Sequence, residues 1–332
     1  MRKKHVTLDD IAKATNLSMY AVSRAVAGKP GISASTRKRI LQVSEELGYT
    51  RPATKKSGQY LLLCIPQSDV EDATFWMPVL QGIESAASRK GFALRVKVIK
   101  PFDEARIDSE VRGATGIFYA GHKSIGTAYK YMGPACPSLL MTYPPESLFR
   151  MDAIHTGDRE AASALCSKLI EWGHRKIGFF GTTERPSTRS RIEGVNEAMH
   201  AAGLKLDHVW NSPDHADVDW VRAELARLQD IDRLPTAVMC STEQLAQSLI
   251  FVLGSMQIAV PKDISVTAFN IDQDDRSPIP LTGTAFDKFD YGRLAFEYLL
   301  DRIERPGSAF NRIVVLPSLL IRETAGPAKS TS

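Results

Sequence analysis

The sequence predicts an α/β protein, with an N-terminal all-α helix-turn-helix headpiece followed by a two-lobed core of parallel sheets. Three observations predict this fold class. Capped helical patterns and concentrated positive charge fill the first fifty residues. From residue 60 onward, apolar runs of strand length alternate with amphipathic segments. The chain has 332 residues, and the roughly 265 residues that follow the headpiece suit two lobes better than one.

Residues 7–26 indicate two short helices joined by a tight turn. Thr7 (with Asp10) and Ser18 are expected N-caps, because their oxygens can accept hydrogen bonds from the free amides of a first helical turn. Asn16 suits the turn, since asparagine tolerates a left-handed backbone. Apolar residues recur at helical spacing on both sides of the turn: Leu8, Ile11, Ala12, Val22, Ala25 and Val26.

A third helix is expected to brace this pair. Ser33–Thr36 supply its N-cap, and Gly48 ends it. Its inward side chains are expected to be Ile40, Val43, Ser44 and Leu47. Two short helices with a tight turn and a bracing helix form a helix-turn-helix module, whose second helix enters the DNA major groove.

The charge distribution supports DNA binding. Residues 1–56 contain twelve Lys and Arg against four Asp and Glu, a net charge of +8. The whole chain is +4, so residues 57–332 carry −4. A basic headpiece on an acidic body is what phosphate neutralisation requires.

The second helix carries the candidate base-reading residues. Met19 can touch thymine methyl groups, and Tyr20 offers apolar surface and a hydroxyl, although Tyr20 could instead pack on the headpiece core. Arg24 lies on the same helical face and could read guanine or bind phosphate. The remaining candidates would position phosphates: Thr7, Ser18, Ser23, Ser33, Thr36 and Arg37.

Residues 50–59 have a polar, Pro- and Gly-containing composition and are expected to form a linker. Buried strands are expected after it at 60–66, 92–99, 116–120, 137–141, 176–181, 236–240, 264–269 and 312–317. Helices are expected between them at 77–90, 159–172, 188–202, 218–229, 243–254 and 290–304. Repeated alternation predicts mainly parallel sheets, with ligands at the carboxyl ends of the strands.

Several protein classes are disfavoured. Four scattered cysteines without a CxxC pair argue against a metal site or a disulfide framework and fit a reducing cytosol. No apolar run approaches the roughly 18–20 residues of a membrane span, and no secretory signal follows the basic N-terminus. We find no nucleophile elbow, phosphate loop, dinucleotide motif or metal-ligand spacing. We therefore expect a cytoplasmic protein with no catalytic residues, metal or cofactor.

The chain closely resembles the lactose-repressor/galactose-repressor family of bacterial transcription regulators. The resemblance covers nearly the whole length, and the ordered set of motifs is more specific than any one of them. The matching segments are 6–12 (VTLDDIA), 22–24 (VSR), 47–49 (LGY), 75–76 (FW), 81–84 (QGIE), 172–177 (WGHRKI), 191–194 (RIEG), 261–266 (PKDISV), 316–317 and 322–323.

The resemblance implies a dimeric, two-lobed, periplasmic-binding-protein-like core with a small effector between the lobes. The expected partners are therefore an operator of roughly palindromic double-stranded DNA, a small polar metabolite and a second copy of the chain, with no membrane. The boundaries that follow are a headpiece at 1–49, a linker at 50–59, a core at 60–325 and a flexible tail at 326–332. We expect the regulator to be a repressor.

The linker departs from the family pattern. Family members usually carry a longer interval here, which folds into a hinge helix on DNA and supplies a leucine wedge. Residues 50–59 contain no leucine, so the minor-groove kink is not carried over.

Phe75 and Trp76 would give the effector an aromatic wall suited to the apolar face of a sugar. Arg191 would fork onto paired ligand oxygens. Trp220 could stack on the ligand or anchor a helix in the core. Hydrogen bonds to the rest of the ligand would come from Asp158, Thr242 and Asn270.

Asn270 stands where the family often has a carboxylate. Because Arg185 and Arg189 lie near Arg191 in the sequence, we expect the site to carry a net positive charge. Such a charge would suit a carboxylate or phosphate on the ligand. The alternative is that Arg185 and Arg189 face solvent.

Overall fold

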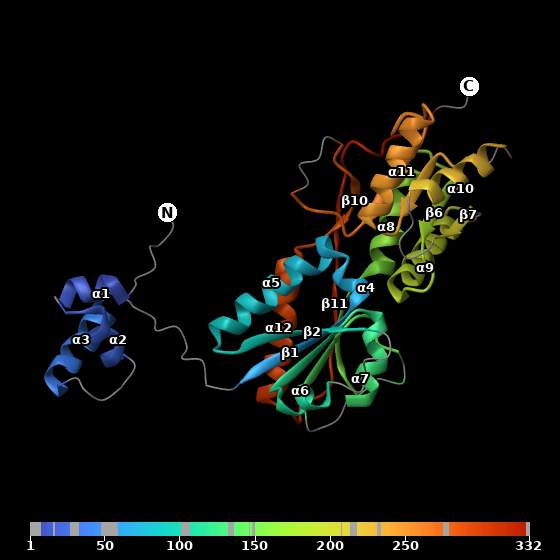
Figure 1. Ribbon diagram of the computed structural model, residues 1–332. Helices are drawn as coiled ribbons and strands as arrows, with labels where there is room; N and C mark the ends of the chain where they lie inside the picture. The colour runs from blue at the N-terminus through green and yellow to red at the C-terminus, as the bar shows by residue number, and fades with distance from the viewer. Residues whose placement is uncertain are drawn as a thin grey trace. The chain divides into compact units, whose positions relative to one another are not determined.

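Three short helices form the headpiece of the computed structural model (Figure 1). They are α1 (Leu8–Thr15), α2 (Met19–Val26) and α3 (Ala34–Glu46). The structure describes residues 8–15, 17–26, 33–47, 59–100, 107–131, 136–145, 147, 150–206, 208–212, 218–230, 234–274 and 279–329.

The expected headpiece pattern is observed in the described residues. Ile11, Val22 and Ile40, one from each helix, are fully buried together. The Ser18 hydroxyl accepts from the amide of Ala21 at 3.2 Å, and Ser33 caps α3 by accepting from the amide of Thr36 at 3.2 Å. Leu47 was expected inward but is 40% exposed, because α3 ends one residue before it. Thr7, Asn16 and Gly48 lie outside the described residues.

The core contains two six-stranded sheets. The first has the strand order β11-β5-β4-β3-β1-β2, and the second β12-β10-β9-β8-β6-β7. Only the β10–β12 pair is antiparallel among the paired strands that the structure describes. The strands of the first sheet are β1 (Tyr60–Pro66), β2 (Ala93–Ile99), β3 (Gly116–Ala120), β4 (Ser138–Met141), β5 (Asp152–Thr156) and β11 (Arg312–Val315). Those of the second are β6 (Ile177–Gly181), β7 (His208–Asn211), β8 (Ala237–Cys240), β9 (Ser265–Phe269), β10 (Thr282–Ala285) and β12 (Ser318–Leu320).

Helices pack around each sheet. Lobe one, built on the first sheet, has α4 (Gln67–Val70), α5 (Ala73–Arg89), α6 (Asp108–Gly113), α7 (Ile125–Tyr131), the 3₁₀ helix η2 (His122–Ser124) and α12 (Lys288–Glu304). Lobe two, built on the second, has α8 (Asp158–Glu171), α9 (Pro186–Ala201), α10 (Val218–Asp230) and α11 (Glu243–Ser255). The chain passes between the lobes after β5, after β10 and after β11.

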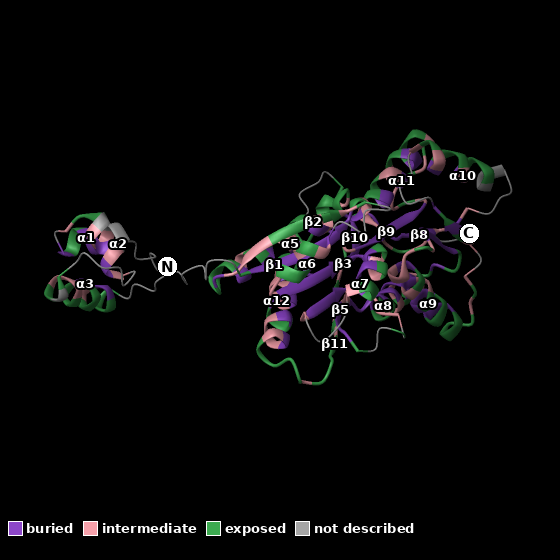
Figure 2. Ribbon diagram, turned by 60° about the horizontal axis from the view of Figure 1, so that its bottom comes forward, coloured by how far each residue is buried: buried purple, intermediate pink, exposed green. Residues whose placement is uncertain are grey.

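The central strands are buried on both faces, as their continuous apolar composition predicts (Figure 2). The four cysteines are all free; three of them are buried and Cys136 is half-buried. Burial raises the pKa of the Cys64 and Cys166 thiols to about 12, so they behave as small apolar side chains. In the described part of the chain, no helix is long and apolar enough to span a membrane.

Helices α8 and α9 pack closely because of Gly194. A side-chain carbon at Gly194 would overlap the carbonyl oxygen of Arg159 on α8, so only glycine permits this spacing. Arg191 lies on α9 three residues before Gly194, so the close approach also fixes the position of Arg191.

Helix α5 begins at Ala73, four residues before the expected start, and contains Pro78. Proline lacks the amide that would bond to the carbonyl of Thr74 four residues earlier. The ammonium of Lys288 donates to that carbonyl at 3.3 Å instead. A side chain from α12 therefore replaces the missing backbone bond, which local sequence could not indicate.

The C-terminal segment expected as a tail begins in contact with the core. The amide of Ala328 donates to the carbonyl of Trp172 at 2.8 Å, and Lys329 pairs with Asp263 at 2.9 Å. The buried ring of His174 bridges the hydroxyl of Thr236 and the carbonyl of Gly326 at 2.9 Å each.

Candidate functional site

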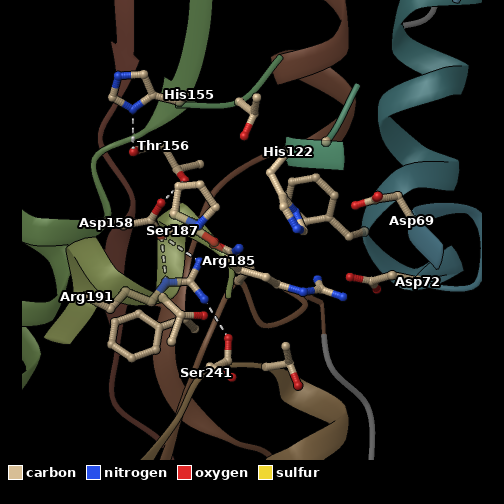
Figure 3. Close-up of a pocket in the computed structure, with 18 of the residues that line it drawn as sticks. Asp69, Asp72, His122, His155, Thr156, Asp158, Arg185, Ser187, Arg191 and Ser241 are labelled. Carbon is tan, nitrogen blue, oxygen red and sulfur yellow. Dashed lines mark hydrogen bonds and ion pairs between the residues drawn. The ribbon is translucent and has the colours of Figure 1, made fainter. Parts of the chain in front are cut away.

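A cavity lies between the two lobes, where the carboxyl ends of their parallel strands face each other. Side chains from both lobes line it (Figure 3). Lobe one contributes Asp69, Asp72, Thr74, Phe75, Trp76, Gly121, His122, Met141, Thr142, Tyr143, His155, Thr156 and Tyr291. Lobe two contributes Asp158, Arg185, Pro186, Ser187, Thr188, Arg191, Ser241, Thr242, Glu243, Gln244, Phe269 and Asn270.

A buried ion pair forms the floor of this cavity. Nη2 of Arg191 lies 2.5 Å from Oδ1 of Asp158, and both side chains are less than 5% exposed. Oδ2 of Asp158 accepts from Thr156 at 2.7 Å and from the hydroxyl of Tyr143 at 2.9 Å. Arg191 also donates to the carbonyl of Ser241 at 2.5 Å. This arrangement satisfies both charges, as burial requires.

Arg191 already contacts several protein groups. Its guanidinium is engaged by Asp158 and Ser241, and its plane lies over the ring of Phe269 at 4.7 Å. The interaction ties the start of α8 to the end of β8. Arg191 lines the cavity as part of a fixed polar floor, and the fork onto ligand oxygens stays a prediction.

The aromatic wall is present. The rings of Phe75 and Trp76 meet edge to face with centroids 5.0 Å apart, and Phe75 also meets Phe286 at 6.0 Å. Trp76 is buried, while Phe75 is half-buried. Because two neighbouring rings hold Phe75 in place, it is a preformed apolar surface.

Asn270 and Thr242 end adjacent strands of lobe two. Asn270 follows β9 with a φ of 57°, a left-handed conformation that asparagine accepts. Its Oδ1 atom is buried, with no hydrogen-bond partner among the described residues. Thr242 caps α11 by accepting from the amide of Leu245 at 3.2 Å, so its hydroxyl proton is left to donate.

The lining includes every predicted effector residue except Trp220. The six that converge are Phe75, Trp76, Asp158, Arg191, Thr242 and Asn270. The stacking role considered for Trp220 is wrong: it packs into the core of lobe two, edge to face with Phe180 at 5.7 Å. Val221 and Leu225 of α10 are buried in the same core, which agrees with the other possibility considered for Trp220, that it anchors a helix.

The expectation of a net positive charge in the site is also wrong. Arg189 does not line the cavity, because its guanidinium donates to the carbonyls of Thr183 and Glu184 in its own loop. Four carboxylates line the cavity, those of Asp69, Asp72, Asp158 and Glu243, against the two guanidinium groups of Arg185 and Arg191. The lining charge is therefore −2 with neutral histidines.

Sequence reasoning missed the acidic segment after β1. Asp69 and Asp72 lie where a parallel strand ends, the position at which ligand-binding residues gather, and this signal could have found them. Gln244 was also missed. From lobe two, its amide donates to Thr74 at 2.6 Å and to Asp72 at 3.3 Å, so it bridges the lobes.

The headpiece presents the predicted DNA-contacting residues unevenly. Met19 is 57% exposed at the start of α2, which suits a base-reading position. Ser18 and Ser33 are exposed, and Arg24, Thr36 and Arg37 are half-buried. Thr7 and the side chains of Tyr20 and Ser23 lie outside the described residues. Among described residues, no cluster of three or more His, Cys, Asp or Glu side chains could hold a metal ion.

Two family models match consecutive parts of the chain. Residues 7–52 match the model described as bacterial regulatory proteins, lacI family. Residues 166–325 match the model described as a periplasmic binding protein-like domain.

Relatives and solved structures match over nearly the whole chain. The HTH-type transcriptional repressor CytR of Escherichia coli K12 is 25% identical over 314 residues, which cover 90% of each chain. The transcriptional regulator CelR in complex with cellobiose has a TM-score of 0.70 at 21% identity, covering 97% of this chain and all of that one. The lac repressor dimer bound to operator and the anti-inducer ONPF has a TM-score of 0.69 at 19% identity, covering 97% and 99%.

These likenesses agree with the parallel two-lobed core and with the helix-turn-helix headpiece. The relatives are transcriptional repressors rather than enzymes. The chain belongs to the lacI family of bacterial regulatory proteins and is a DNA-binding transcriptional regulator whose core is periplasmic-binding-protein-like.

Proposed function

We propose that a sugar or sugar derivative binds in the cavity between the lobes and changes the affinity of the headpieces for an operator. One observation carries the proposal: residues from both lobes converge on one cavity that has a preformed aromatic wall. A ligand that contacts both lobes necessarily has different affinities for closed and open arrangements, so it shifts the balance between them.

The wall and floor suit a polyhydroxylated molecule. Phe75 supplies an apolar surface for the face of a pyranose ring. Asn270 Oδ1 is an available acceptor, and the hydroxyl of Thr242 an available donor, for ligand hydroxyls. The complex of the related CelR with cellobiose supports this ligand class.

The operator is expected to be roughly palindromic. Two headpieces related by a two-fold axis would read two half-sites, and the lac repressor structure, a dimer on operator, supports that arrangement. The base-reading face would be that of Met19, Tyr20 and Arg24, with phosphates held by Ser18, Ser33 and Arg37.

The effector role is tested by measuring operator affinity in the presence of single sugars, with Phe75→Ala as the binding variant. We expect at least one sugar to shift operator affinity in the parent protein, and the shift to disappear in Phe75→Ala while operator affinity without sugar stays the same. Phe251→Ala, exposed on α11, is the matched aromatic control. A response that persists in Phe75→Ala would reject the cavity as the effector site.

A further inference from the structure

Carboxylates outnumber guanidinium groups in the lining of the cavity. Asp158 and Arg191 neutralise each other in the floor. Among the described residues, the rest of the lining contains Asp69, Asp72 and Glu243 and one further guanidinium group, that of Arg185. Figure 3 shows the Arg185 side chain reaching across the cavity toward Asp72, with Asp69 beside it.

Asp69 is a buried carboxylate that lines the cavity. Its side chain packs against the backbone of Gly121, where an added Cβ would lie 2.7 Å from Oδ1. The residue is only 5% exposed, and its hydrogen bond from Ser68 is long, at 3.4 Å. Burial raises the pKa of Asp69 although Arg185 and Lys123 oppose that shift. Its surroundings thus leave part of the cost of its charge uncompensated.

Neighbouring charges do not reverse this imbalance. Lys123 and Arg185 face Asp69, while Asp72 adds a like charge. Lys288 lies near Asp72, Glu243 and Asp272, and burial lowers the pKa of Lys288. Adding Lys123, Lys288 and Asp272 to the lining leaves a net charge of −1.

One buried acceptor in the cavity wall has no donor among the described residues. It is the Oδ1 atom of Asn270. This acceptor lies on lobe two, so it is independent of the acidic segment on lobe one. Buried acceptors without donors are costly, so the occupant should supply donors.

We propose that the effector carries a protonated amine, as an amino sugar does, and that Asp69 and Asp72 bind this ammonium group. An ammonium has three donors and no acceptor, which matches a wall of carboxylates. The sugar ring would lie against Phe75, and its hydroxyls would reach Asn270. This inference rests on the proposed function and narrows its ligand class.

The test compares hexoses that differ at one nitrogen. Calorimetry of the intact protein with D-glucosamine, D-galactosamine and D-mannosamine is set against their N-acetyl derivatives, the parent hexoses and glucose 6-phosphate. We expect an amino sugar to bind at least tenfold more tightly than its uncharged N-acetyl counterpart, and glucose 6-phosphate to bind most weakly.

Two variants and one control locate the contact. Asp69→Asn and Asp72→Asn should each lower the affinity for the amino sugar. The loss should be about tenfold or more for Asp69→Asn, because Asp69 is buried and losing a buried charge partner costs more than about 1.4 kcal/mol, whereas Asp72 is only half-buried. Neither should lower the affinity for the N-acetyl counterpart as strongly. Asp219→Asn, an exposed carboxylate on α10, should change neither affinity.

Proton release gives an independent readout. A bound ammonium would lower the pKa of Asp69, so binding at mildly acidic pH should release protons, and Asp69→Asn should abolish that release. The inference is overturned if no amino sugar binds, or if acetylation leaves affinity unchanged. In either case, binding of neutral hexoses that shifts operator affinity would leave the proposed function standing. If no sugar binds and none alters operator affinity, both fail.

Discussion

Asp152 of β5 and Arg302 of α12 form a buried ion pair, with Oδ2 and Nε 2.6 Å apart. Arg302 also donates to the carbonyls of Pro306, Ser308 and Ala309, so it orders the turn that leads into β11. Asp152 accepts in addition from the amide of Asn311 at 2.6 Å. One charge pair therefore fixes the edge of the first sheet.

Removing one partner should be strongly destabilising. Asp152→Ala leaves the guanidinium of Arg302 buried without its carboxylate, which typically costs about 3–5 kcal/mol. Urea denaturation should show this loss. The exposed pair of Asp301 and Arg305 is the control, and Asp301→Ala should change stability little. Equal effects of the two substitutions would contradict the importance of burial.

Asp158 and Arg191 should behave as one unit. Each single substitution, Asp158→Asn or Arg191→Gln, leaves the other charge buried and partly unpaired. The double variant removes both charges, so its loss of stability should be smaller than the sum of the single losses by about 0.5–3 kcal/mol. Thermal denaturation of the four proteins measures this coupling. Strict additivity would mean that the pair has no net interaction.

Substitutions of a base-reading residue and of a phosphate-contacting residue should change DNA binding in different ways. Met19→Ala removes an exposed apolar side chain at the start of α2, so base preference should relax at specific positions, by about 1–3 kcal/mol each if the contact is direct. Arg37→Ala should weaken binding similarly on all sequences and reduce its salt dependence. Selection from random DNA, followed by salt titrations, separates these outcomes. An unchanged motif in Met19→Ala would exclude base reading by this residue.

The sequence alone predicted the helices and strands whose own residues show the expected pattern of apolar side chains or caps. Continuous apolar runs marked β1 and β8, and side-chain caps marked α2 and α3. Strand β5 was missed because Asp152 and His155 interrupt its apolar pattern, and the partner of Asp152 lies 150 residues away. Strand β10, Thr-Gly-Thr-Ala, has almost no apolar signal, although all four residues are buried.

Some residues of the site could be predicted before the structure was known, whereas the contacts between them could not, because those contacts depend on how the helices and lobes are packed. Phe75, Trp76 and Asn270 were identified through the resemblance to the family, and all three line the cavity. The engagement of Arg191 by Asp158 could not be read from sequence, because it depends on how closely α9 approaches α8. The sign of the cavity charge depends on Asp69 and Asp72, which come from the opposite lobe.

Asp69 should reduce stability at neutral pH. Burial raises its folded-state pKa, so the folded protein holds this proton more tightly than the unfolded chain does. Stability from this group is present below the unfolded pKa and lost as pH rises through the raised folded value. Asp69→Asn should therefore raise the melting temperature at neutral pH but not below about pH 4, near the ordinary pKa.

Asp263 provides a control of opposite sign. Its pKa is lowered by the hydrogen bond from the amide of Ala259 and by Lys329. Its contribution is present above the unfolded pKa and lost as pH falls, so Asp263→Asn should lower the neutral-pH melting temperature. Melting curves across the pH range check both variants. A less stable Asp69→Asn at neutral pH would show that its ion pairing outweighs its burial.

The linker leads to a prediction about DNA shape. Residues 50–59 contain no leucine, and all but Gln59 lie outside the described residues, so the argument rests on composition. Proteins that kink DNA at the minor groove insert an apolar wedge between base pairs and bend the duplex by about 20–90°. Without that wedge, unstacking a base step has no compensating contact, so the operator should be bent less than is usual in the family. The effector would then control DNA binding through the spacing of the two headpieces. A circular-permutation assay with the full-length protein should give almost equal mobilities for all positions of the operator.

The variant Thr54→Leu restores an apolar side chain in the linker. The same assay on this variant tests whether a wedge alone introduces a bend. A sharp central kink with the parent protein would refute the prediction.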